Sequence, residues 1–249
     1  MAFRFYVGLH QPNDSQHFGR ACISINRLRG RKKPIPCPDV LVDSGAFTEL
    51  LNHGRYRHSV TEYAAEVRRL HVMGVVSITT AVAQDYMCEP FMLAKTGLTL
   101  EDHQRLTIER YDALVAECPP VPIMPVLQGF APGSYADHVS AYGDRLKFGM
   151  WVGVGSVCKR QGDARAIVRV LSAIKALRPD LRLHGFGVKT TALQHPGVRS
   201  LLETADSMAW SFAARKEGRN GNDWREARKF SDVIHRSPEQ TFWQGELAI

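Results

Sequence analysis

The chain lacks several features that would define common classes of protein. Its five cysteines are scattered, and no two of them form a C-x-x-C or C-x-C pair, so neither a disulfide framework nor a cysteine-rich zinc site is predicted. No run of about 18 apolar residues is present, so no membrane span is expected. Residues 1–7 lack the basic-then-apolar layout of a signal peptide and are predicted to form a strand. A reducing cytoplasm is therefore the expected location. The cysteines are Cys22, Cys37, Cys88, Cys118 and Cys158.

Two catalytic fingerprints and a metal pattern are also missing. No glycine-rich dinucleotide motif follows the first predicted strand, which weakens a Rossmann interpretation. No G-x-S-x-G elbow or trustworthy Ser-His-Asp order is present. His53 and His58 lie in a polar, basic stretch and lack metal-ligand spacing, so we interpret them as surface residues. Neither a cofactor nor a metal is expected.

What is present is an excess of positive charge, +7 over 249 residues. The basic residues cluster in 27–33, in 55–57 and in 215–229. Clustered basic loops suit a nucleic-acid backbone. An ordinary solvated surface explains them equally well at this point.

Apolar, β-rich runs alternate with amphipathic helical stretches along a chain that is 44% hydrophobic. Capping patterns at Ser59 with Glu62, and at Thr99 with Asp102, predict two of the helix starts. Strand alternating with helix, without a break in composition, predicts one α/β domain over 1–249, of the TIM-type (β/α)8 barrel class, with a basic helical segment at about 216–249. An eighth strand is not identified. The seven runs are Phe3–Leu9, Val40–Val42, Val75–Val82, Ile123–Leu127, Met150–Val154, Leu181–Phe186 and Ser207–Phe212.

Polar residues recur where the predicted strands end. Because the carboxyl ends of parallel strands meet at one face of a barrel, these residues are expected to converge there. Each alone is explained more simply as a turn residue or helix cap, but the set favours a shared site. The positions are Asp43-Ser44-Gly45, Gln84-Asp85, Gln128-Gly129, Gly153–Ser156, His184–Gly187 and Asp206.

These groups match the edge of a purine, guanine in particular. A carboxylate can accept hydrogen bonds from the N1–H and the exocyclic amine, while an amide and backbone N–H groups reach O6. Phe47 could stack on the base. A remaining carboxylate could attack the anomeric carbon of a sugar, as in covalent glycosyl transfer.

Five longer stretches resemble a known family. In order and in sequence they are similar to the deazapurine-in-DNA (7-deazaguanine) transglycosylases, relatives of the tRNA-guanine transglycosylases, over about Phe5 to Arg215. The stretches are VDSGAF (42–47), DYMCEP (85–90), GSVCKRQ (155–161), LHGFGVKT (183–190) and ADSMAWSFAAR (205–215).

The resemblance implies a barrel enzyme that exchanges guanine for a 7-deazaguanine, with 7-cyano-7-deazaguanine expected, and that leaves the β-configuration unchanged. Asp206 would be the nucleophile that bonds to the sugar C1′, and Asp43 the group that moves protons to and from the base. The residues implied to hold the base are Ser44, Phe47, Asp85, Gln128, Gly153, Gly155 and His184.

Two departures from the tRNA enzymes favour DNA as the polymer. The tRNA enzymes carry a zinc subdomain after the nucleophile, whereas Glu217–Ile249 contains no cysteine, so that subdomain is expected to be missing. The region that would grip tRNA is also short. The expected partners are DNA and the free base, together with other DNA-modification proteins; no membrane contact is expected. The residues expected to hold the DNA backbone are Arg27, Arg29, Arg31, Lys32, Lys33, Lys189, Arg215, Lys216 and Arg219.

Three alternatives stay open. The chain could be a tRNA transglycosylase without its zinc module. It could be an idle barrel that binds a nucleic acid or a nucleobase, although two converging carboxylates suit a pure binder of a polyanion poorly. It could also act on a small anionic metabolite, which would require a glycine-rich phosphate turn late in the chain; Gly218–Gly221 is too charged to resemble one.

Overall fold

The computed structural model describes residues 3–157 and 163–236. Residues 158–161 of the third family-like stretch, and residues 237–249 of the predicted basic helical segment, lie outside this range. No helix in the described part of the chain is long and apolar enough to cross a membrane.

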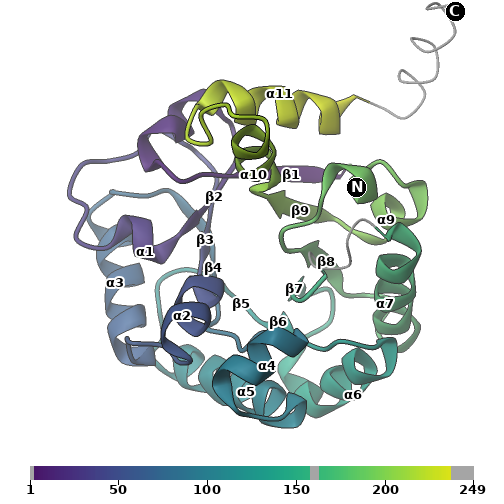
Figure 1. Ribbon diagram of the computed structural model, residues 1–249. Coiled ribbons are helices and arrows are strands. Elements are labelled where there is room, and N and C mark those ends of the chain that lie inside the picture. Colours follow the sequence, from purple (N-terminus) through teal and green to yellow (C-terminus); the bar gives the residue numbers. More distant parts are fainter. Residues whose placement is uncertain (1–2, 158–162, 237–249) are drawn as a thin grey trace, which may run out of the picture.

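The strands form one barrel with helices around it (Figure 1). Nine strands pair in the order β5-β4-β3-β2-β1-β9-β8-β7-β6, and every ladder is parallel. The strands are β1 (Arg4–Gly8), β2 (Ala21–Ser24), β3 (Val40–Asp43), β4 (Ile78–Val82), β5 (Ile123–Met124), β6 (Val126–Leu127), β7 (Trp151–Val154), β8 (Arg182–Gly185) and β9 (Thr204–Ser207).

Strands β5 and β6 together occupy one strand position in the barrel. Only Pro125 separates them, and a proline has no backbone N–H with which to continue a ladder. β5 pairs with β4 on one side and β6 pairs with β7 on the other. Counting the two as one reduces nine strands to eight, so the predicted TIM-type (β/α)8 barrel is confirmed.

One strand was missed in the sequence, and one predicted run was wrong. The strand that was not identified is β2, which has only four residues between Arg20 and a short helix, too few to show a clear alternation. The last predicted run, Ser207–Phe212, is mostly helix: β9 ends at Ser207 and a helix begins at Ala209. Trp210 and Ala214 of that helix face the core at helical spacing, a pattern that hydrophobic content alone does not distinguish from a strand.

The helices occupy the connections between strands, as the barrel class requires. Both predicted capping boxes are present, Ser59 with Glu62 and Thr99 with Asp102. The helices of four or more residues are α1 (Ile25–Leu28), α2 (Ala46–His53), α3 (Val60–Val72), α4 (Pro90–Thr96), α5 (Leu100–Ala116), α6 (Pro132–Tyr142), α7 (Ala164–Leu177), α8 (Thr190–Leu193), α9 (Pro196–Leu201), α10 (Ala209–Lys216) and α11 (Trp224–His235), with the 3-10 helix η1 (Pro12–His17) after β1.

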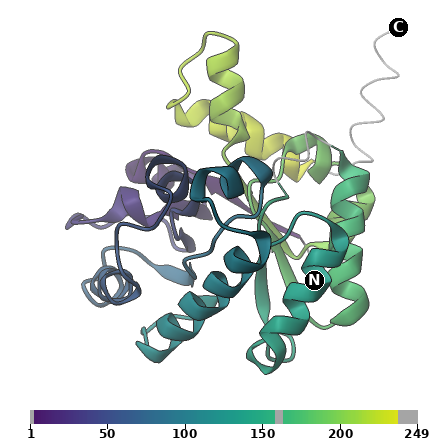
Figure 2. The ribbon, with the colours of Figure 1, turned by 60° about the horizontal axis from the view of Figure 1, so that its bottom comes forward.

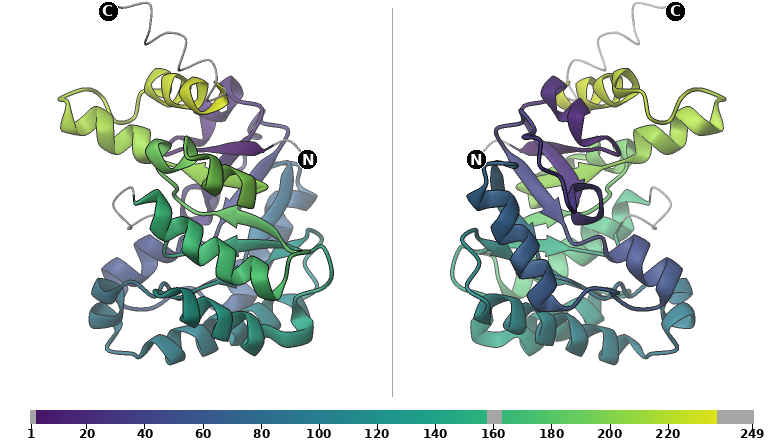
Figure 3. Two further views of the ribbon diagram at one scale, coloured as in Figure 1. Left: turned by 90° about the vertical axis from the view of Figure 1, so that its right-hand side faces the viewer. Right: turned by 90° about the vertical axis from the view of Figure 1, so that its left-hand side faces the viewer.

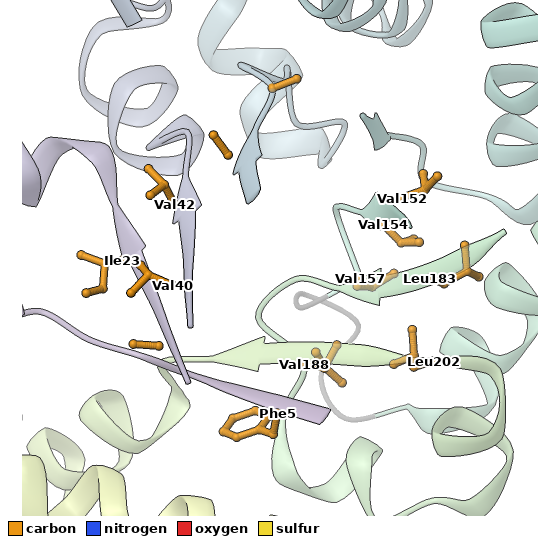
Figure 4. Packing of buried hydrophobic residues seen from close by; sticks show 14 of the residues in the cluster. Phe5, Ile23, Val40, Val42, Val152, Val154, Val157, Leu183, Val188 and Leu202 are labelled. Atoms are coloured by element: carbon orange, nitrogen blue, oxygen red, sulfur yellow. The ribbon is translucent and has the colours of Figure 1, made fainter. Parts of the chain in front are cut away.

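Alternation along each strand separates an outer core from a barrel interior. Outward side chains pack against the helices; they include Val40 and Val42, which are labelled in Figure 4, and Ala205. Inward side chains form a second, smaller cluster that fills the barrel. The interior cluster is Tyr6, Cys22, Leu41, Val82, Met124 and Val126, with Trp151 and Phe186 packed against it.

The same alternation fixes which polar side chains enter the barrel. Leu41 points inward and Val42 outward, so Asp43 at the end of β3 points inward again. In β9, Ala205 packs outward, which turns Asp206 toward the interior. The carboxyl ends of the strands therefore present two acidic side chains to the same space.

Helices α10 and α11 form a hairpin beside the strand ends. α10 follows β9 directly, and the two helices pack against each other. In Figures 2 and 3 the hairpin projects from the barrel, and α10 lies at the end that also carries α2 and α4. We call this carboxyl-terminal end of the barrel its mouth.

Candidate active site

The structure brings together the carboxylates and the amide that were predicted from the strand ends. Asp43 ends β3, Gln128 directly follows β6, and Asp206 lies within β9. Asp85 follows β4 after a short irregular segment. A hydrogen bond joins Gln128 to Asp85, and the charges of Asp85 and Asp206 both act on Asp43. Residues separated by more than 160 positions in the chain thus share one site at the mouth.

Asp43 is placed so that it can carry a proton near neutral pH. Burial raises its pKa from 3.8 to about 7, and the negative charges of Asp85 and Asp206 add to the effect. The Gly45 N–H donates to its Oδ2 at 2.9 Å, which counteracts part of the rise. Gly45 has φ 80°, and a Cβ there would lie 2.6 Å from the Asn26 amide, so this tight turn needs glycine.

Asp206 is held from two sides. Its Oδ1 accepts a hydrogen bond from the Gly187 N–H at 3.1 Å and lies 3.3 Å from His184 Nε2. Its side chain is only 11% exposed. These contacts fix the direction of the carboxylate, which is consistent with its predicted role as a nucleophile.

Cys22 lies between the two acids, and sequence reasoning missed it. Its thiol forms a hydrogen bond with Asp206. Burial, with the nearby charges of Asp206 and Asp43, holds the pKa of the thiol well above its usual range. The side chain therefore stays a neutral thiol that packs and donates. Its strand, β2, was itself not predicted, so no signal pointed to this position.

Asp85 belongs to a buried network that includes Ser44 and Gln128. The Ser44 hydroxyl donates to Asp85 Oδ1 at 3.1 Å, and Gln128 Nε2 donates to Oδ2 at 2.5 Å. The Tyr56 hydroxyl donates to the Asp85 carbonyl at 2.9 Å. Burial raises the pKa of Asp85 to about 6, although the hydrogen bonds from Gln128 and Ser44 oppose the rise. Tyr56, in a basic loop, was not predicted.

Gln128 is also fixed at its other end. The Ser156 hydroxyl lies 2.7 Å from Gln128 Oε1 and 2.9 Å from Glu89 Oε2, and it accepts the Cys88 N–H at 3.0 Å. Ser156 has φ 56°, which is unusual for a residue with a side chain. Such strain persists where surrounding contacts over-determine the conformation, commonly at functional sites.

The backbone of Gln128 is equally constrained. Its N–H donates to His138 Nδ1 at 2.9 Å, and its carbonyl accepts from Gln104 Nε2 at 2.7 Å. Burial lowers the pKa of His138 to about 4, so this imidazole is neutral at physiological pH and can accept. The amide of Gln128 is therefore preorganised before any ligand arrives.

Gly153 and Gly155 make room for the site, but their own N–H groups donate to the Pro125 and Leu127 carbonyls in the strand ladder, so these donors are already used. A Cβ at Gly155 would lie 2.1 Å from Gln128 Nε2, and one at Gly153 would lie 2.3 Å from Phe186. Gly155 thus allows Gln128 to lie across the strand end and reach Asp85.

Replacing Gly155 with alanine should disrupt this arrangement selectively. The added methyl group displaces the Gln128 amide from Asp85, and a misplacement of about 1 Å can cost about a hundredfold in rate. We expect Gly155→Ala to raise the KM for the free base or lower its affinity by at least about tenfold, measured by titration of the base, with the melting temperature little changed. Gly133→Ala is the control, because a Cβ at Gly133 meets nothing within 4 Å. Equal affinities of the two variants for the base would contradict this role of Gly155.

The two residues predicted to flank the base have different positions. Phe47 is the second residue of α2, which follows the Asp43-Ser44-Gly45 turn, and its side chain is 43% exposed. His184 is fully buried, with Thr204 and Asp206 at its two ring nitrogens. The structure therefore places His184 behind Asp206 rather than on the open side of the site.

Some of the predicted backbone-binding residues meet near the mouth. Arg27 on α1 and Arg215 on α10 both lower the pKa of His10, which follows β1, so the two basic segments converge there; burial of His10 is the larger cause. Lys216 on α10 and Lys189 after β8 are exposed. Lys189 is two residues from Gly187, whose N–H donates to Asp206.

The remaining basic residues are placed differently. The Gly30 N–H and the Arg31 carbonyl bond to Glu66 and Arg69 of α3, so this segment lies against the outer wall of the barrel. Arg219 forms ion pairs with Glu217 and Glu226. The structure therefore does not bring the whole predicted set together. Arg29 is half-buried next to Gly30, the Arg31 Nε–H donates to the Lys33 carbonyl, and Lys32 and Lys33 are exposed.

Comparison with known proteins identifies the family. Residues 1–227 match the family DeoxyPurine in DNA protein A (DpdA). The chain belongs to this family. Membership indicates a DNA-modifying, transglycosylase-like role with DNA as the substrate polymer. No curated protein matches the chain.

The match covers every element that builds the mouth, from β1 through α10. Across residues 3–157 and 163–236, no group of three or more His, Cys, Asp or Glu side chains is arranged to hold a metal ion.

Proposed function

We propose that the protein exchanges guanine in DNA for a 7-deazaguanine, 7-cyano-7-deazaguanine being the expected base, through a covalent bond between Asp206 and the sugar C1′. The observation that carries the proposal is the pairing of two unlike carboxyl groups at one mouth. Asp43, with its pKa raised to about 7, can give and take a proton. Asp206 is aimed by Gly187 and His184. Family membership supplies the polymer.

The first half of the reaction releases guanine. A carboxylate oxygen of Asp206 attacks C1′, the C1′–N9 bond breaks, and its electron pair leaves with the base. Protonated Asp43 gives its proton to the departing guanine. The products are a glycosyl ester on Asp206, an ionised Asp43 and free guanine.

The second half runs in the opposite sense. The incoming 7-deazaguanine loses its N9 proton to Asp43, and N9 attacks C1′. The ester bond breaks and Asp206 leaves as a carboxylate. Two inversions at C1′ return the β-configuration, and both carboxyl groups regain their starting states, so no external oxidant or reductant is required.

Recognition of the base is assigned to the fixed network below the mouth. Asp85 oxygens can each accept a further hydrogen bond besides those from Ser44 and Gln128, which suits the N1–H and exocyclic amine of guanine. Backbone at Gly153 and Gly155 borders the same space, and Phe47 can stack on the base. Because the network is already satisfied internally, it loses little freedom when the base binds.

Reaching this site requires the target nucleotide to leave the DNA stack. Flipping costs a few kcal/mol, which contacts to the backbone must offset. Arg27, Lys189, Arg215 and Lys216 lie around the mouth and are the residues that we assign to phosphate contacts.

The direct test supplies 7-cyano-7-deazaguanine with either duplex DNA or tRNA and identifies the modified nucleoside by mass after digestion. The proposal predicts that the modified base is found only as a 2′-deoxyribonucleoside, that is, only in the DNA. Incorporation into tRNA alone would favour a tRNA enzyme without its zinc module. Binding of either polymer without incorporation would favour an idle barrel, and both results would overturn the proposal.

Salt should reveal the backbone contacts. The logarithm of the DNA affinity falls with the logarithm of salt concentration by about 0.9 per phosphate contact. The double variant Arg215→Ala/Lys216→Ala should therefore have a slope shallower by roughly one to two contacts, measured by fluorescence anisotropy. Lys147→Ala removes an equally exposed charge before the start of β7, at the opposite end of the barrel, and should leave the slope unchanged. Identical slopes for both variants would contradict the assignment.

A further inference from the structure

A chain of hydrogen bonds runs inside the barrel and ends on Asp206. The Trp151 indole N–H donates to Thr204 Oγ1 at 2.8 Å. Thr204 Oγ1 lies 2.9 Å from His184 Nδ1. His184 Nε2 lies 3.3 Å from Asp206 Oδ1. Three neighbouring strands, β7, β8 and β9, supply these four side chains.

Donor chemistry gives the chain a direction. The indole nitrogen of Trp151 can only donate, so the Thr204 oxygen accepts there. The hydroxyl proton of Thr204 is then available for His184 Nδ1, which accepts it as the unprotonated nitrogen of a neutral imidazole. At the other nitrogen, a carboxylate oxygen can only accept, so Nε2 carries the ring proton and donates it to Asp206.

Packing leaves the ring of His184 little freedom to adopt another arrangement. His184 and Thr204 are both fully buried. The imidazole makes edge contacts with Phe186, at 4.6 Å between ring centroids, and with Trp151 at 6.0 Å. The absence of a side chain at Gly153 leaves room for Phe186 in this position, because a Cβ there would displace the Phe186 ring. A ring flip would break the hydrogen bonds at both buried nitrogens, which makes the flipped arrangement costly.

We propose that His184 is a positioning residue for Asp206, with its tautomer set by Thr204 and Trp151. The Nε2–H holds Oδ1 in place while the carboxylate attacks C1′. In the second half-reaction it stabilises the negative charge that returns to Asp206 as the ester breaks. The catalytic consequence rests on the proposed function, whereas the tautomer and its dependence on Thr204 do not.

The tautomer can be measured without any substrate. In protein labelled with 15N-histidine, two-bond correlation spectra distinguish a protonated ring nitrogen from an unprotonated one. The signals of His184 are those that disappear in His184→Gln. We expect Nε2 protonated and Nδ1 unprotonated in the wild type and in Thr204→Ser, which keeps the hydroxyl. Thr204→Val, which keeps the shape and removes the hydroxyl, should change the Nδ1 shift or populate the other tautomer.

Two spectral results would overturn the inference. One is a His184 ring with its proton on Nδ1, or with protons on both nitrogens, in the wild type at neutral pH. The other is a spectrum of His184 that is the same in Thr204→Val as in the wild type. If the valine variant does not fold, the wild-type and serine spectra still decide the first point.

Kinetics then tests the consequence for exchange. Loss of a partner that orients a reacting group typically costs about 10- to 100-fold. We expect Thr204→Val to lower kcat by that amount with the KM for the base unchanged, because His184 does not face the base. His184→Gln should retain more activity than His184→Asn, since only the glutamine amide reaches the position of Nε2. A rise in KM with kcat unchanged, or equal activity of the glutamine and asparagine variants, would contradict the positioning role.

Absence of exchange in the wild type would count against the proposed function, and the spectra would still decide the tautomer.

Discussion

Asp206→Asn should reduce base exchange by about ten-thousandfold or more, because an amide cannot form the glycosyl ester on which both half-reactions depend. The substitution keeps the size of the side chain. The amide oxygen of the new side chain can still accept from the Gly187 N–H and from His184 Nε2, the two contacts that orient the residue. The expected result is therefore an inactive protein with a nearly unchanged melting temperature and unchanged affinity for DNA.

The matched control is Asp112→Asn. Asp112 forms an exposed ion pair with Arg145 on the outside of the barrel, where such pairs contribute little. Exchange by this variant should equal that of the wild type in the labelled-base assay. If Asp206→Asn incorporated base at a rate comparable to Asp112→Asn, Asp206 would not be the nucleophile.

Asp43→Asn is expected to have the second largest effect, and of a different kind. The amide cannot move a proton, so both half-reactions slow, and we expect a loss of about a hundred- to ten-thousandfold, the range for general acid–base catalysis. The covalent intermediate can still form slowly, because the nucleophile is intact. Quenched-flow analysis with labelled DNA should therefore show slow formation of the Asp206 adduct rather than its absence.

The stability of the same variant should depend on pH in a predictable direction. The folded-state pKa of Asp43, about 7, lies above its ordinary value of 3.8, so the folded protein binds the proton more tightly than the unfolded chain. The contribution of Asp43 to stability is therefore greatest at low pH and is lost as pH rises from about 4 to about 7. The asparagine side chain of the variant carries no charge at any pH. The melting temperature of Asp43→Asn should exceed that of the wild type increasingly as pH rises through this window.

Thermal unfolding at about pH 5 and about pH 8 measures the effect. Asp85, with its pKa raised to about 6, adds its own dependence to both proteins, which is why the difference between them is the informative quantity. If the difference in melting temperature between the two proteins stayed constant across this range, the charge of Asp43 would not destabilise the folded state. The assignment of Asp43 as the proton carrier would then lose its physical basis.

Much of the architecture followed from local patterns. The capping boxes at Ser59 and Thr99 located two helix starts, and the alternation of strand with helix indicated the barrel. The failures have a common origin in short elements. β2 has four residues, and its alternation is no clearer than that of a loop. Its identity depends on pairing with β1 and β3, from which loops and short helices separate it in the sequence.

The site was predictable where the backbone dictates it, and less so where packing does. Strand ends converge in any parallel barrel, so Asp43, Gln128 and Asp206 could be grouped before the structure was known. The contacts of Cys22 and Tyr56 could not, because they depend on which side chains meet across the interior. His184 illustrates the same limit, since its family position suggested contact with the base, whereas the structure buries it behind Asp206.

Charge was the least predictive feature. The basic stretch 27–33 forms one unit in the sequence, but the structure divides it. Arg27 lies near Arg215 beside His10, whereas Arg31 lies against α3. A cluster in the sequence becomes a cluster in space only when the backbone keeps it on one face.

The most direct test of the account captures the covalent intermediate. The protein is mixed with guanine-labelled duplex DNA without any incoming base, denatured, and digested, and the peptide that carries a deoxyribose-linked oligonucleotide is identified by mass. The account predicts an adduct that survives denaturation, maps to Asp206, is absent in Asp206→Asn, and disappears when 7-cyano-7-deazaguanine is added. An adduct on any other residue, or exchange into DNA with no adduct formed, would contradict it.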